Sequence, residues 1–427
     1  MDPDESITGL PQRMIPVILP RSAHTVSRTL IDEEALKVLY RLHHHGFLAY
    51  LVGGSVRDIL LGRTPKDFDV ATNAHPQEVN ALFRNSRIIG RRFRLVQVYF
   101  KGGKVVEVST FRSRSEYEEI ETEDGTTIRT DSFGAPDEDA FRRDLTINAL
   151  FYNIANFSII DFVGGMEDLK KGIIRTIGDP GERFRQDPVR MIRVIRHAAR
   201  IGFTIDATTY QALLHHRDEL QTCSSSRIRD EFLRDLKEGA AEPSLRLMLE
   251  TGILFSLFPE FARTFGERNP FKDRAQHFLL ALFGLVDRLV NTGRPVSDSM
   301  LLALLVTPLL QVLSPEHPYL EEKERNIYRA QNIRFVLHQS LIPCSIPRGT
   351  REAAAQILNA QSILKRSLRH GLISRRLRTK KYFQEAALYL GIEAQARGER
   401  VPHILRRSVP QDFLPWWPKE SRKGSFR

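Results

Sequence analysis

The spacing of apolar residues changes several times in the first third of the chain. Between Ile31 and Gly46, apolar residues recur every three or four positions and the segment ends at a glycine, which predicts an amphipathic helix. The apolar run FLAYLV begins at Phe47 and predicts a strand, and a Gly-Gly turn, a short helical segment and the extended segment DFDV follow it. This part of the chain is therefore expected to be a mixed α/β unit.

Two further extended runs, LVQVYF and VVEVSTF, flank the tight turn 101–104 and predict a β-hairpin. Residues 114–137 are charged and hold few apolar side chains, which predicts a mobile loop. After Gly181 the apolar spacing is helical to the end, so we expect no further strands. The predicted fold class is α+β, with a small mixed-sheet head followed by an all-helical neck and body.

The composition narrows the class of protein. The chain has 427 residues, of which 41% are hydrophobic, so it is long enough for two or three domains and too apolar for general disorder. Its two cysteines, Cys223 and Cys344, match no metal-ligand spacing, and no apolar run reaches the length of about 18 residues that a membrane span needs. We therefore expect a cytoplasmic protein that does not enter a membrane.

Positive charge is concentrated at the end of the chain. Residues 361–427 hold 16 basic and 5 acidic residues, an excess that equals the net charge of +11 of the whole chain. A localised basic surface commonly binds phosphate polyanions, although a basic surface that serves only solubility is the alternative. The expected RNA-binding residues are Lys365, Arg366, Arg369, Arg375, Arg376, Arg378, Lys380 and Lys381. Trp416 and Trp417 could stack on bases, but packing of the last segment is the favoured interpretation.

A glycine turn follows the first predicted strand. Gly53 and Gly54 would let the backbone approach a phosphate closely, and Arg57 could add a charge-assisted contact. A plain tight turn is the alternative. The presence of Asp67 and Asp69 soon after this turn favours a binding role for it. Their carboxylates would lie on one face of an extended strand. Two such carboxylates suit Mg²⁺, with substrate phosphates completing its coordination shell.

Three further groups of polar residues are candidates for the same site. Glu107 interrupts an apolar strand and could be a third metal ligand, or else a charge on an edge strand. Asp144 and Asn148 would share a helix face, with Arg143 beside them, although a helix-capping aspartate is the alternative. A polar stripe on a later helix would face a nucleotide or only solvent. Its members are Asp187, Arg190, Arg193 and Arg196.

The ordered motifs LVGGSVRD, DFDV, EVSTF, RRDLTINAL and DPVRMIRVIRHAARIGF resemble the class II nucleotidyltransferases, the family of bacterial poly(A) polymerases and tRNA CCA-adding enzymes. The resemblance runs from about Arg21 to Glu260, and the segments RSAHTVSRTLIDEEALKVLYRL and IGRRFRL are similar to the poly(A) polymerase branch. Two residues depart from the family pattern. Gln186 replaces a usual glutamate and Gln97 replaces a histidine that is common in the polymerases.

The resemblance implies a role for each candidate residue. Asp67, Asp69 and Asp144 would be catalytic, and two Mg²⁺ ions would bind at Asp67 and Asp69, with Glu107 as a further metal ligand. The remaining candidates would bind the nucleotide, and ATP would be the substrate. They are Gly53, Gly54, Arg57, Arg143, Asn148, Asp187, Arg190, Arg193 and Arg196.

These roles lead to one favoured function and two alternatives. We expect the chain to add AMP from ATP to RNA 3′ ends without a template and to release pyrophosphate. CCA addition to tRNA, which uses the same residues and CTP as well, is the first alternative, and RNA binding on an inactive scaffold is the second. The expected domains are a flexible arm over residues 1–28, a nucleotidyltransferase head over 29–163, a helical neck over 164–260 and a helical body over 261–427.

Overall fold

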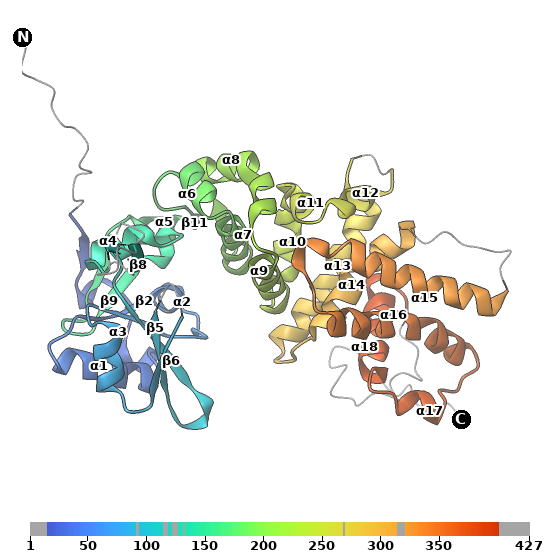
Figure 1. Cartoon of the computed structure of the whole chain (residues 1–427), viewed down its shortest axis with the longest axis horizontal. Helices are drawn as coiled ribbons and strands as arrows, with labels where there is room; N and C mark the ends of the chain where they lie inside the picture. Colours follow the sequence, from blue (N-terminus) through green and yellow to red (C-terminus); the bar gives the residue numbers. More distant parts are fainter. Residues whose placement is uncertain are drawn as a thin grey trace, which may run out of the picture. The chain divides into compact units, whose positions relative to one another are not determined.

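The computed structural model of the chain describes residues 15–90, 94–113, 118–121, 127–130, 133–267, 270–313 and 321–400. The chain divides into two compact units (Figure 1). The first unit contains residues up to 183 and 203–210, and the second contains 184–202 and 211–427. The first unit thus takes in residues 164–183 as well as the head expected over 29–163. In the part of the chain that the structure describes, no helix is both long and apolar enough to cross a membrane.

An eight-stranded mixed sheet forms the centre of the first unit. Its strands, in spatial order, are β1 (Val17–Leu19), β10 (Ile159–Asp161), β9 (Leu150–Asn153), β2 (Ala49–Val52), β3 (Asp69–Thr72), β6 (Val105–Thr110), β5 (Leu95–Tyr99) and β4 (Ser86–Ile89). Neighbouring strands are antiparallel except β3 and β6, which are parallel. The first unit also contains the helices α1 (Glu33–His44), α2 (Gly54–Leu60), α3 (Pro76–Leu82), α4 (Pro136–Arg142) and α5 (Gly165–Lys171), and the 3₁₀ helix η4 (Thr146–Asn148).

Alternation of side chains gives β5 and β6 one covered face and one open face. Val96 and Val98 on β5 and Val106 and Val108 on β6 are buried, and α1 and α3 pack on these strands. The residues between these valines point to the opposite face because successive side chains of a strand alternate. On β6 one of these intervening residues is Glu107, which is exposed. The open face of β5 and β6 therefore carries polar residues.

Several sequence predictions agree with these elements. The helix predicted between Ile31 and Gly46 is α1, and Asp32 caps it by accepting from the N–H groups of Glu34 and Ala35. The predicted hairpin is β5–β6, and the turn between these strands contains Gly102 and Gly103, both with φ of +78°. A side chain at either position would be strained, so glycine is required for this turn.

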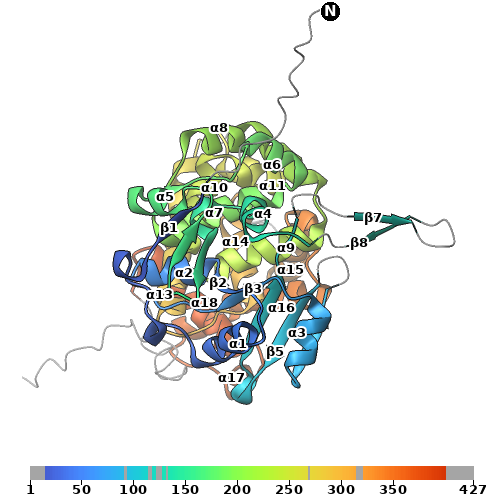
Figure 2. The same ribbon diagram turned by 90° about the vertical axis from the view of Figure 1, so that its left-hand side faces the viewer.

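Three predictions differ from the structure. The segment predicted as an arm contains β1, which pairs with β10 and becomes an edge strand; residues 1–14 lie outside the described residues. The predicted loop 114–137 contains a separate hairpin of β7 (Glu118–Glu121) and β8 (Thr127–Thr130) (Figure 2). Strands also continue after Gly181, because β12 (Thr204–Ile205) pairs in parallel with β11 (Ile173–Ile174).

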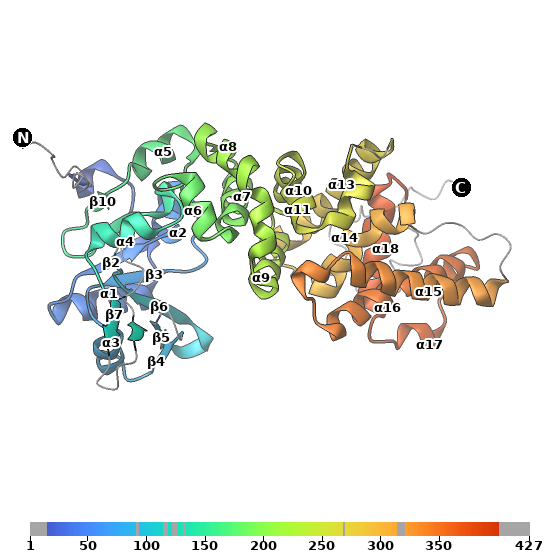
Figure 3. The same cartoon turned by 45° about the horizontal axis from the view of Figure 1, so that its top comes forward.

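The second unit is helical. Its helices are α7 (Val189–Ile201), α9 (Ser225–Lys237), α10 (Ala241–Glu250), α11 (Ile253–Leu257), α12 (Ala262–Phe265), α13 (Lys272–Asn291), α14 (Asp298–Leu313), α15 (Glu322–Gln339), α16 (Arg348–Arg369), α17 (Arg375–Arg378) and α18 (Phe383–Ala396). Helices α6 (Pro180–Gln186) and α8 (Ala207–His216) each continue from one unit into the other. Figure 3 shows α16 among α14, α15 and α18, and it packs against all three.

Candidate active site

A row of polar residues crosses the open face of β5 and β6 and reaches the start of β3. Asp69, at the start of β3, pairs directly with Glu107 on β6, and Glu107 pairs with Gln97 on β5. Directly opposed residues on neighbouring strands have adjacent side chains. Gln97 Nε2 donates to Glu107 Oε1 over 2.9 Å, and Tyr99 donates its hydroxyl proton to Gln97 Oε1 over 2.8 Å. Because β6 lies between β3 and β5, Glu107 is not on an edge strand, and that alternative is wrong.

Only one of the two aspartates of the predicted metal pair lies in a strand. Asp67 and Phe68 precede β3, so the expectation that one strand holds both carboxylates on one face is wrong. Asp67 and Asp69 are both exposed residues. The Asp69 carboxylate nevertheless loses part of its hydration to neighbouring protein atoms. This loss of hydration, together with the negative charges of Glu107 and Asp67, raises the pKa of Asp69 to about 6.

The glycine turn lies directly beside Asp69. Gly53 has φ of +74°, and a Cβ atom at this position would lie 3.7 Å from Asp69 Oδ2 and 3.5 Å from Arg143 Nη1. The positive φ makes any side chain strained here. The turn therefore brings bare backbone next to the carboxylate and the guanidinium, while the phosphate contact expected of Gly53 and Gly54 stays a prediction.

Arg57 is buried beneath this turn. Only 1% of the residue is exposed, its Nη1 donates to Asn148 Oδ1 over 2.6 Å, and its Nε and Nη2 donate to Asp58 Oδ1 over 2.9 and 2.7 Å. Asn148 Nδ2 in turn donates to Asp144 Oδ1 over 3.3 Å. Arg57 thus orients Asn148, and Asn148 contacts Asp144, while the phosphate contact expected of Arg57 stays a prediction.

Arg143 lies at the same place through a different set of contacts. Its Nη2 donates to Asp139 Oδ2 over 2.9 Å, its Nη1 donates to the Asn148 carbonyl over 3.4 Å, and its guanidinium lies 5.1 Å from the centroid of the Phe151 ring. Its positive charge opposes the rise in the pKa of Asp69. Arg143 thus lies beside Asp69, and its contact with Asn148, which donates to Asp144, connects Asp144 to this part of the site.

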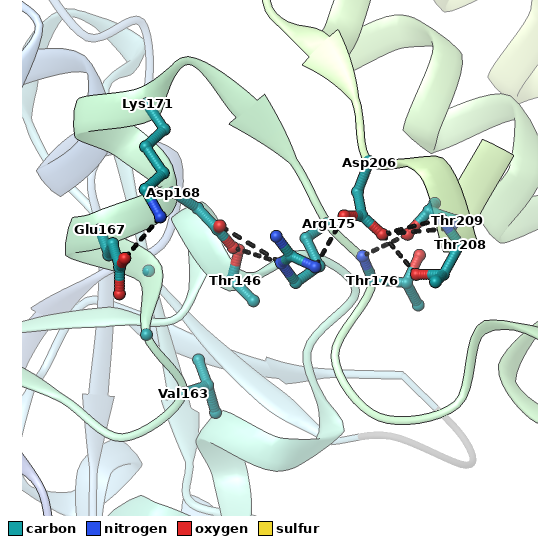
Figure 4. Close-up of polar contacts among 12 residues, drawn as sticks. Thr146, Val163, Glu167, Asp168, Lys171, Arg175, Thr176, Asp206, Thr208 and Thr209 are labelled. Atoms are coloured by element: carbon teal, nitrogen blue, oxygen red, sulfur yellow. Dashed lines mark hydrogen bonds and ion pairs between the residues drawn. The ribbon is translucent and has the colours of Figure 1, made fainter.

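A second set of polar contacts, formed around Asp168 and Arg175, holds the 3₁₀ helix η4 in place (Figure 4). Thr146 Oγ1 donates to Asp168 Oδ2 over 2.7 Å, and Arg175 Nε donates to both oxygens of Asp168 over 3.1 and 3.2 Å. Arg175 Nη1 also lies 2.7 Å from Asp206 Oδ1, at the start of α8. This network could not be predicted from the sequence, because its members lie up to 60 residues apart and match no motif by spacing.

The polar stripe predicted on one helix divides between two environments in the second unit, and its first member, Asp187, precedes α7. Asp187 is paired with Arg227 of α9 at 2.9 Å and lies 4.0 Å from Arg190. Arg196, in contrast, has only 5% of its side chain exposed and contacts Glu231 and Asp235 of α9. Arg196 therefore fixes α7 to α9, and the expectation of one ligand-binding face over the whole stripe is wrong.

Arg193 and Arg227 complete the contacts between these helices. Arg193 lies 3.7 Å from Glu231 and keeps 35% of its side chain exposed. Arg227 could not be predicted as the partner of Asp187, because it lies 40 residues later and the arginines of α9 resemble a solvated basic face. Gln186, the residue that departs from the family pattern, is the exposed last residue of α6.

Two protein-family models match this chain, each over a different part of the sequence. A family model described as the poly A polymerase head domain matches residues 49–175, and one described as the probable RNA and SrmB-binding site of polymerase A matches residues 202–265. Poly(A) polymerase I of Salmonella typhi is 38% identical over 94% of this chain and 84% of its own length. The chain belongs to the poly(A) polymerase family. The corresponding enzyme of Escherichia coli O157:H7 is 35% identical over the same shares.

CCA-adding enzymes are similar to a smaller part of the sequence. The enzyme of Anoxybacillus flavithermus is 41% identical over 54% of this chain and 56% of its own length. Among solved structures, the CCA-adding enzyme of Bacillus stearothermophilus in complex with CTP has a TM-score of 0.63 at 27% identity, and it covers 91% of this chain and 88% of its own. The mixed-sheet head and helical remainder of this poly(A) polymerase family member are thus shared with that enzyme, which confirms the predicted fold class.

The carboxylates of the head fit a divalent cation only in part. Within the described residues, no group of three or more histidine, cysteine, aspartate or glutamate side chains is arranged to hold a metal by itself. Mg²⁺ commonly binds to one or two carboxylates and completes its shell with water and substrate phosphates. Lost hydration, and after it the negative charges of Glu107 and Asp67, raise the pKa of Asp69, and a cation beside these carboxylates would offset both effects.

The predicted RNA-binding residues of the C-terminal region are all exposed. Some of them have structural partners: Lys365 pairs with Glu393, Arg366 with Glu322, and Arg378 donates to the Ile373 carbonyl. The others have no ion pair or side-chain hydrogen bond to a residue that the structure describes, and these are Arg369, Arg375, Arg376, Lys380 and Lys381. Trp416 and Trp417 lie outside the described residues.

Proposed function

We propose that this chain is a polynucleotide adenylyltransferase that adds AMP from ATP to RNA 3′ ends without a template. The structural observation that carries the proposal is the pairing of Asp69 with Glu107 beside the Gly53 turn. The poly(A) polymerase I relatives match 94% of the chain, whereas the CCA-adding relative from Anoxybacillus flavithermus matches 54%. The extent of similarity therefore favours polyadenylation over CCA addition. The cytoplasmic location stays a prediction.

The reaction is a phosphoryl transfer. The 3′-hydroxyl oxygen of the RNA forms a bond to the α-phosphorus of ATP, the bond from that phosphorus to the oxygen bridging the α- and β-phosphates breaks, and pyrophosphate leaves while the hydroxyl proton passes to solvent. Gly53 and Gly54 give the phosphates access to backbone, and Arg143 supplies positive charge beside them. Arg57 and Asn148 orient Asp144 within the same cluster.

Mg²⁺ is the cation that these residues would hold. Asp67 and Asp69 would bind it, with Glu107 as a further ligand whose Oε1 also accepts from Gln97. Bound Mg²⁺ supplies charge that lowers the pKa of an attacking hydroxyl and neutralises a departing pyrophosphate. Carboxylates alone would repel the triphosphate, so the protein's own arrangement favours binding of the nucleotide together with the cation.

Selection of the base is proposed for the start of the neck helix, where Asp187 precedes α7 and Arg190 lies in its first turn. Asp187 would accept from the amino group of adenine, and Arg190 would donate to an adjacent ring acceptor. Guanine and uracil present a carbonyl where adenine and cytosine present an amino group, so this pair would reject the first two. The contact between Arg227 and Asp187 would hold the carboxylate in position, and the nucleotide contact of Arg193 stays a prediction.

Replacing Arg227 with alanine is expected to weaken base selection while leaving the fold intact. The KM for ATP should rise about tenfold, the effect of losing one charge-assisted hydrogen bond, and incorporation of GTP and UTP should become measurable. Arg246→Ala is the matched control, because its side chain is 54% exposed, against 55% for Arg227, and pairs with Glu242. Steady-state kinetics with each nucleotide measure both effects. Equal KM values for Arg227→Ala and Arg246→Ala would remove Arg227 from base selection.

The decisive test of the function is a product ladder on a gel. Purified protein and Mg²⁺ receive each nucleoside triphosphate singly, then CTP with ATP, and two RNAs: an unstructured oligomer and a tRNA that ends before CCA. Long extension of both RNAs with ATP alone is the expected result. Addition of two C and one A to the tRNA only would establish CCA addition instead, and no extension of either RNA would leave an RNA-binding scaffold.

A further inference from the structure

A hollow of about 630 Å³ lies in the first unit, where α1 approaches the ends of α3 and β5 (Figure 2). Helix α1 supplies one wall, and Phe83, which follows α3, and Phe100, which follows β5, supply the rest. Because Phe100 continues the alternation of the buried Val96 and Val98, it lies on the covered face of β5. The hollow is therefore on the side of the sheet opposite to Glu107.

Apolar side chains of this hollow keep part of their surface in solvent. Leu36, Tyr40 and Phe100 are only partly buried, and Phe83 lines the hollow although it is 6% exposed. The Tyr40 ring is held in place, since Arg28 Nη1 donates to its hydroxyl oxygen over 2.9 Å. Apolar surface in a concave site with a polar rim is typical of an interaction site. The hollow is thus suited to receive an apolar side chain from another molecule.

The rim of the hollow is positively charged. Its basic residues are Lys37, Arg41, His44 and His45, all of them exposed, and no carboxylate is among the described residues that line it. Lys37 lies 4.0 Å from Glu34. Arg41 has no ion pair or side-chain hydrogen bond to any residue in the described ranges, and its guanidinium lies over the Phe83 ring, 5.4 Å from the centroid. An acidic ligand would therefore complement this rim.

The nearest carboxylates do not neutralise the rim. Asp32 and Glu34, at the start of α1, both contact Lys104 of the β5–β6 turn. The helix dipole accounts for basic residues in the last turn of α1, because cations stabilise a helix C-terminus. It does not account for an apolar hollow beside them. Positive charge and partly exposed rings at one place together indicate a ligand that is both acidic and apolar.

The position of the hollow favours a protein partner over the substrate RNA. Helix α1 packs on β2, β3 and β6, and it covers the face of β6 opposite to Glu107. An RNA whose 3′ end lies beside Glu107 would have to pass around the edge of the sheet to reach the hollow. Single-stranded RNA sites also follow the phosphate backbone with a groove of cations, whereas this hollow is concave and lined by apolar groups at its centre.

We propose that the α1 hollow, defined as Leu36, Lys37, Tyr40, Arg41, Phe83 and Phe100, is a docking site for an acidic segment of a partner protein. A bulky apolar side chain of that segment, such as phenylalanine or leucine, would pack against the rings, and flanking carboxylates would pair with Lys37 and Arg41. The proposal goes beyond the proposed function, because it uses no residue of the candidate active site.

The first part of the test identifies the chemistry of the ligand. A random peptide library displayed on phage is selected on the immobilised full chain. We expect the enriched peptides to combine several acidic residues with one aromatic residue or leucine. The most enriched peptide, labelled with fluorescein, is then titrated with each protein variant, and fluorescence anisotropy gives its Kd.

The second part assigns the binding to the hollow. Lys37→Gln/Arg41→Gln removes the two charges of the rim, and the matched control Lys170→Gln/Arg274→Gln removes an exposed lysine of α5 and an exposed arginine of α13 that do not line the hollow. The rim variant should raise the Kd of the peptide about tenfold, the effect of losing two exposed ion pairs. Leu36→Gln, which removes apolar surface and adds no charge, should raise it about fivefold. The control should match the wild type, and melting temperatures show that each variant is folded.

The remaining outcomes also have a defined meaning. Selection that enriches no acidic peptide, or an unchanged Kd in the rim variant or in Leu36→Gln, would overturn the proposal. A rim variant that binds an unstructured RNA more weakly but the peptide normally would assign the hollow to RNA instead. AMP incorporation by the rim variant should equal that of the wild type, and a lower kcat would contradict a pure docking role. If the wild type makes no ladder with ATP, the proposed function fails while the peptide titration still tests the hollow.

Discussion

Replacing Asp69 with asparagine is expected to abolish AMP incorporation without destabilising the protein. The substitution keeps the shape of the side chain and removes one oxygen charge from the carboxylate pair that would hold Mg²⁺. We expect kcat to fall by at least about 10³-fold, since the charge that develops during phosphoryl transfer would lose its stabilisation. Single-turnover incorporation of labelled AMP into an unstructured RNA measures the loss.

The same variant should keep or raise the melting temperature of the metal-free protein. Asp69 lies beside Glu107 and Asp67, and this repulsion contributes to the rise of its pKa to about 6. Removing one of three neighbouring negative charges relieves that repulsion. A residue under functional selection commonly shows this combination of lost activity and kept stability. Thermal unfolding without Mg²⁺ measures it, and near-normal activity of Asp69→Asn would remove Asp69 from the catalytic site.

Asp161 provides the matched control for a structural carboxylate in the same unit. Its side chain accepts from the N–H groups of Val163, Gly164, Gly165 and Met166 over 2.9 to 3.1 Å, and only 3% of the residue is exposed. Asp161→Asn is expected to lower the free energy of unfolding by about 1–3 kcal/mol, because the amide cannot accept all four bonds. Activity should fall only where the variant unfolds. The two aspartates thus separate a catalytic role from a structural one.

The period of apolar residues was enough to predict the elements that position the site. The strand, Gly-Gly turn and helix around Gly53 and the hairpin that carries Glu107 follow from local spacing and turn residues, which depend on neighbours within a few positions. From the sequence, Asp69 and Glu107 could be expected only on neighbouring strands. Their direct pairing needs the parallel register of β3 and β6, which side-chain periodicity does not specify.

Burial of charged residues could not be predicted in the same way. Arg57 and Arg196 look like surface arginines in the sequence, because spacing along a helix reveals partners only three or four positions away. The buried partner of Arg57 is Asn148, 91 residues later, and that of Arg196 is Asp235, 39 residues later. Edge strand β1 was missed for a related reason, since a three-residue strand has too few positions to show alternation.

Arg196→Met is expected to be the most destabilising single substitution in α7. The methionine fills a similar space but leaves Asp235, which is 1% exposed, without its arginine. Removing one partner of a buried ion pair costs about 3–5 kcal/mol. At temperatures where the variant is folded, the ratio of kcat/KM values for ATP and CTP should not change. A nucleotide contact by Arg196 would produce the reverse, with altered selection and normal stability.

The pH dependence of this variant gives a second readout. Burial raises the pKa of Asp235 to about 7, and the charge of Arg196 opposes that rise. Without the arginine the pKa of Asp235 rises further, so the folded variant binds a proton that the unfolded chain, with an aspartate pKa near 3.9, has already released at pH 5 and above. The free energy of unfolding of Arg196→Met should therefore fall as the pH rises from 5 to 8, more steeply than in the wild type.

The double variant Arg196→Met/Asp235→Leu separates loss of the pair from loss of packing. Replacing both partners of a buried ion pair with apolar residues is often neutral or stabilising, so this variant should recover most of the stability that Arg196→Met loses. Its unfolding free energy should also lose the added pH dependence, because the buried carboxylate is gone. Denaturant unfolding at pH 5 and pH 8 measures both quantities. A double variant no more stable than Arg196→Met would mean that the contact of Arg196 with Glu231, which also holds α7 to α9, is the dominant one.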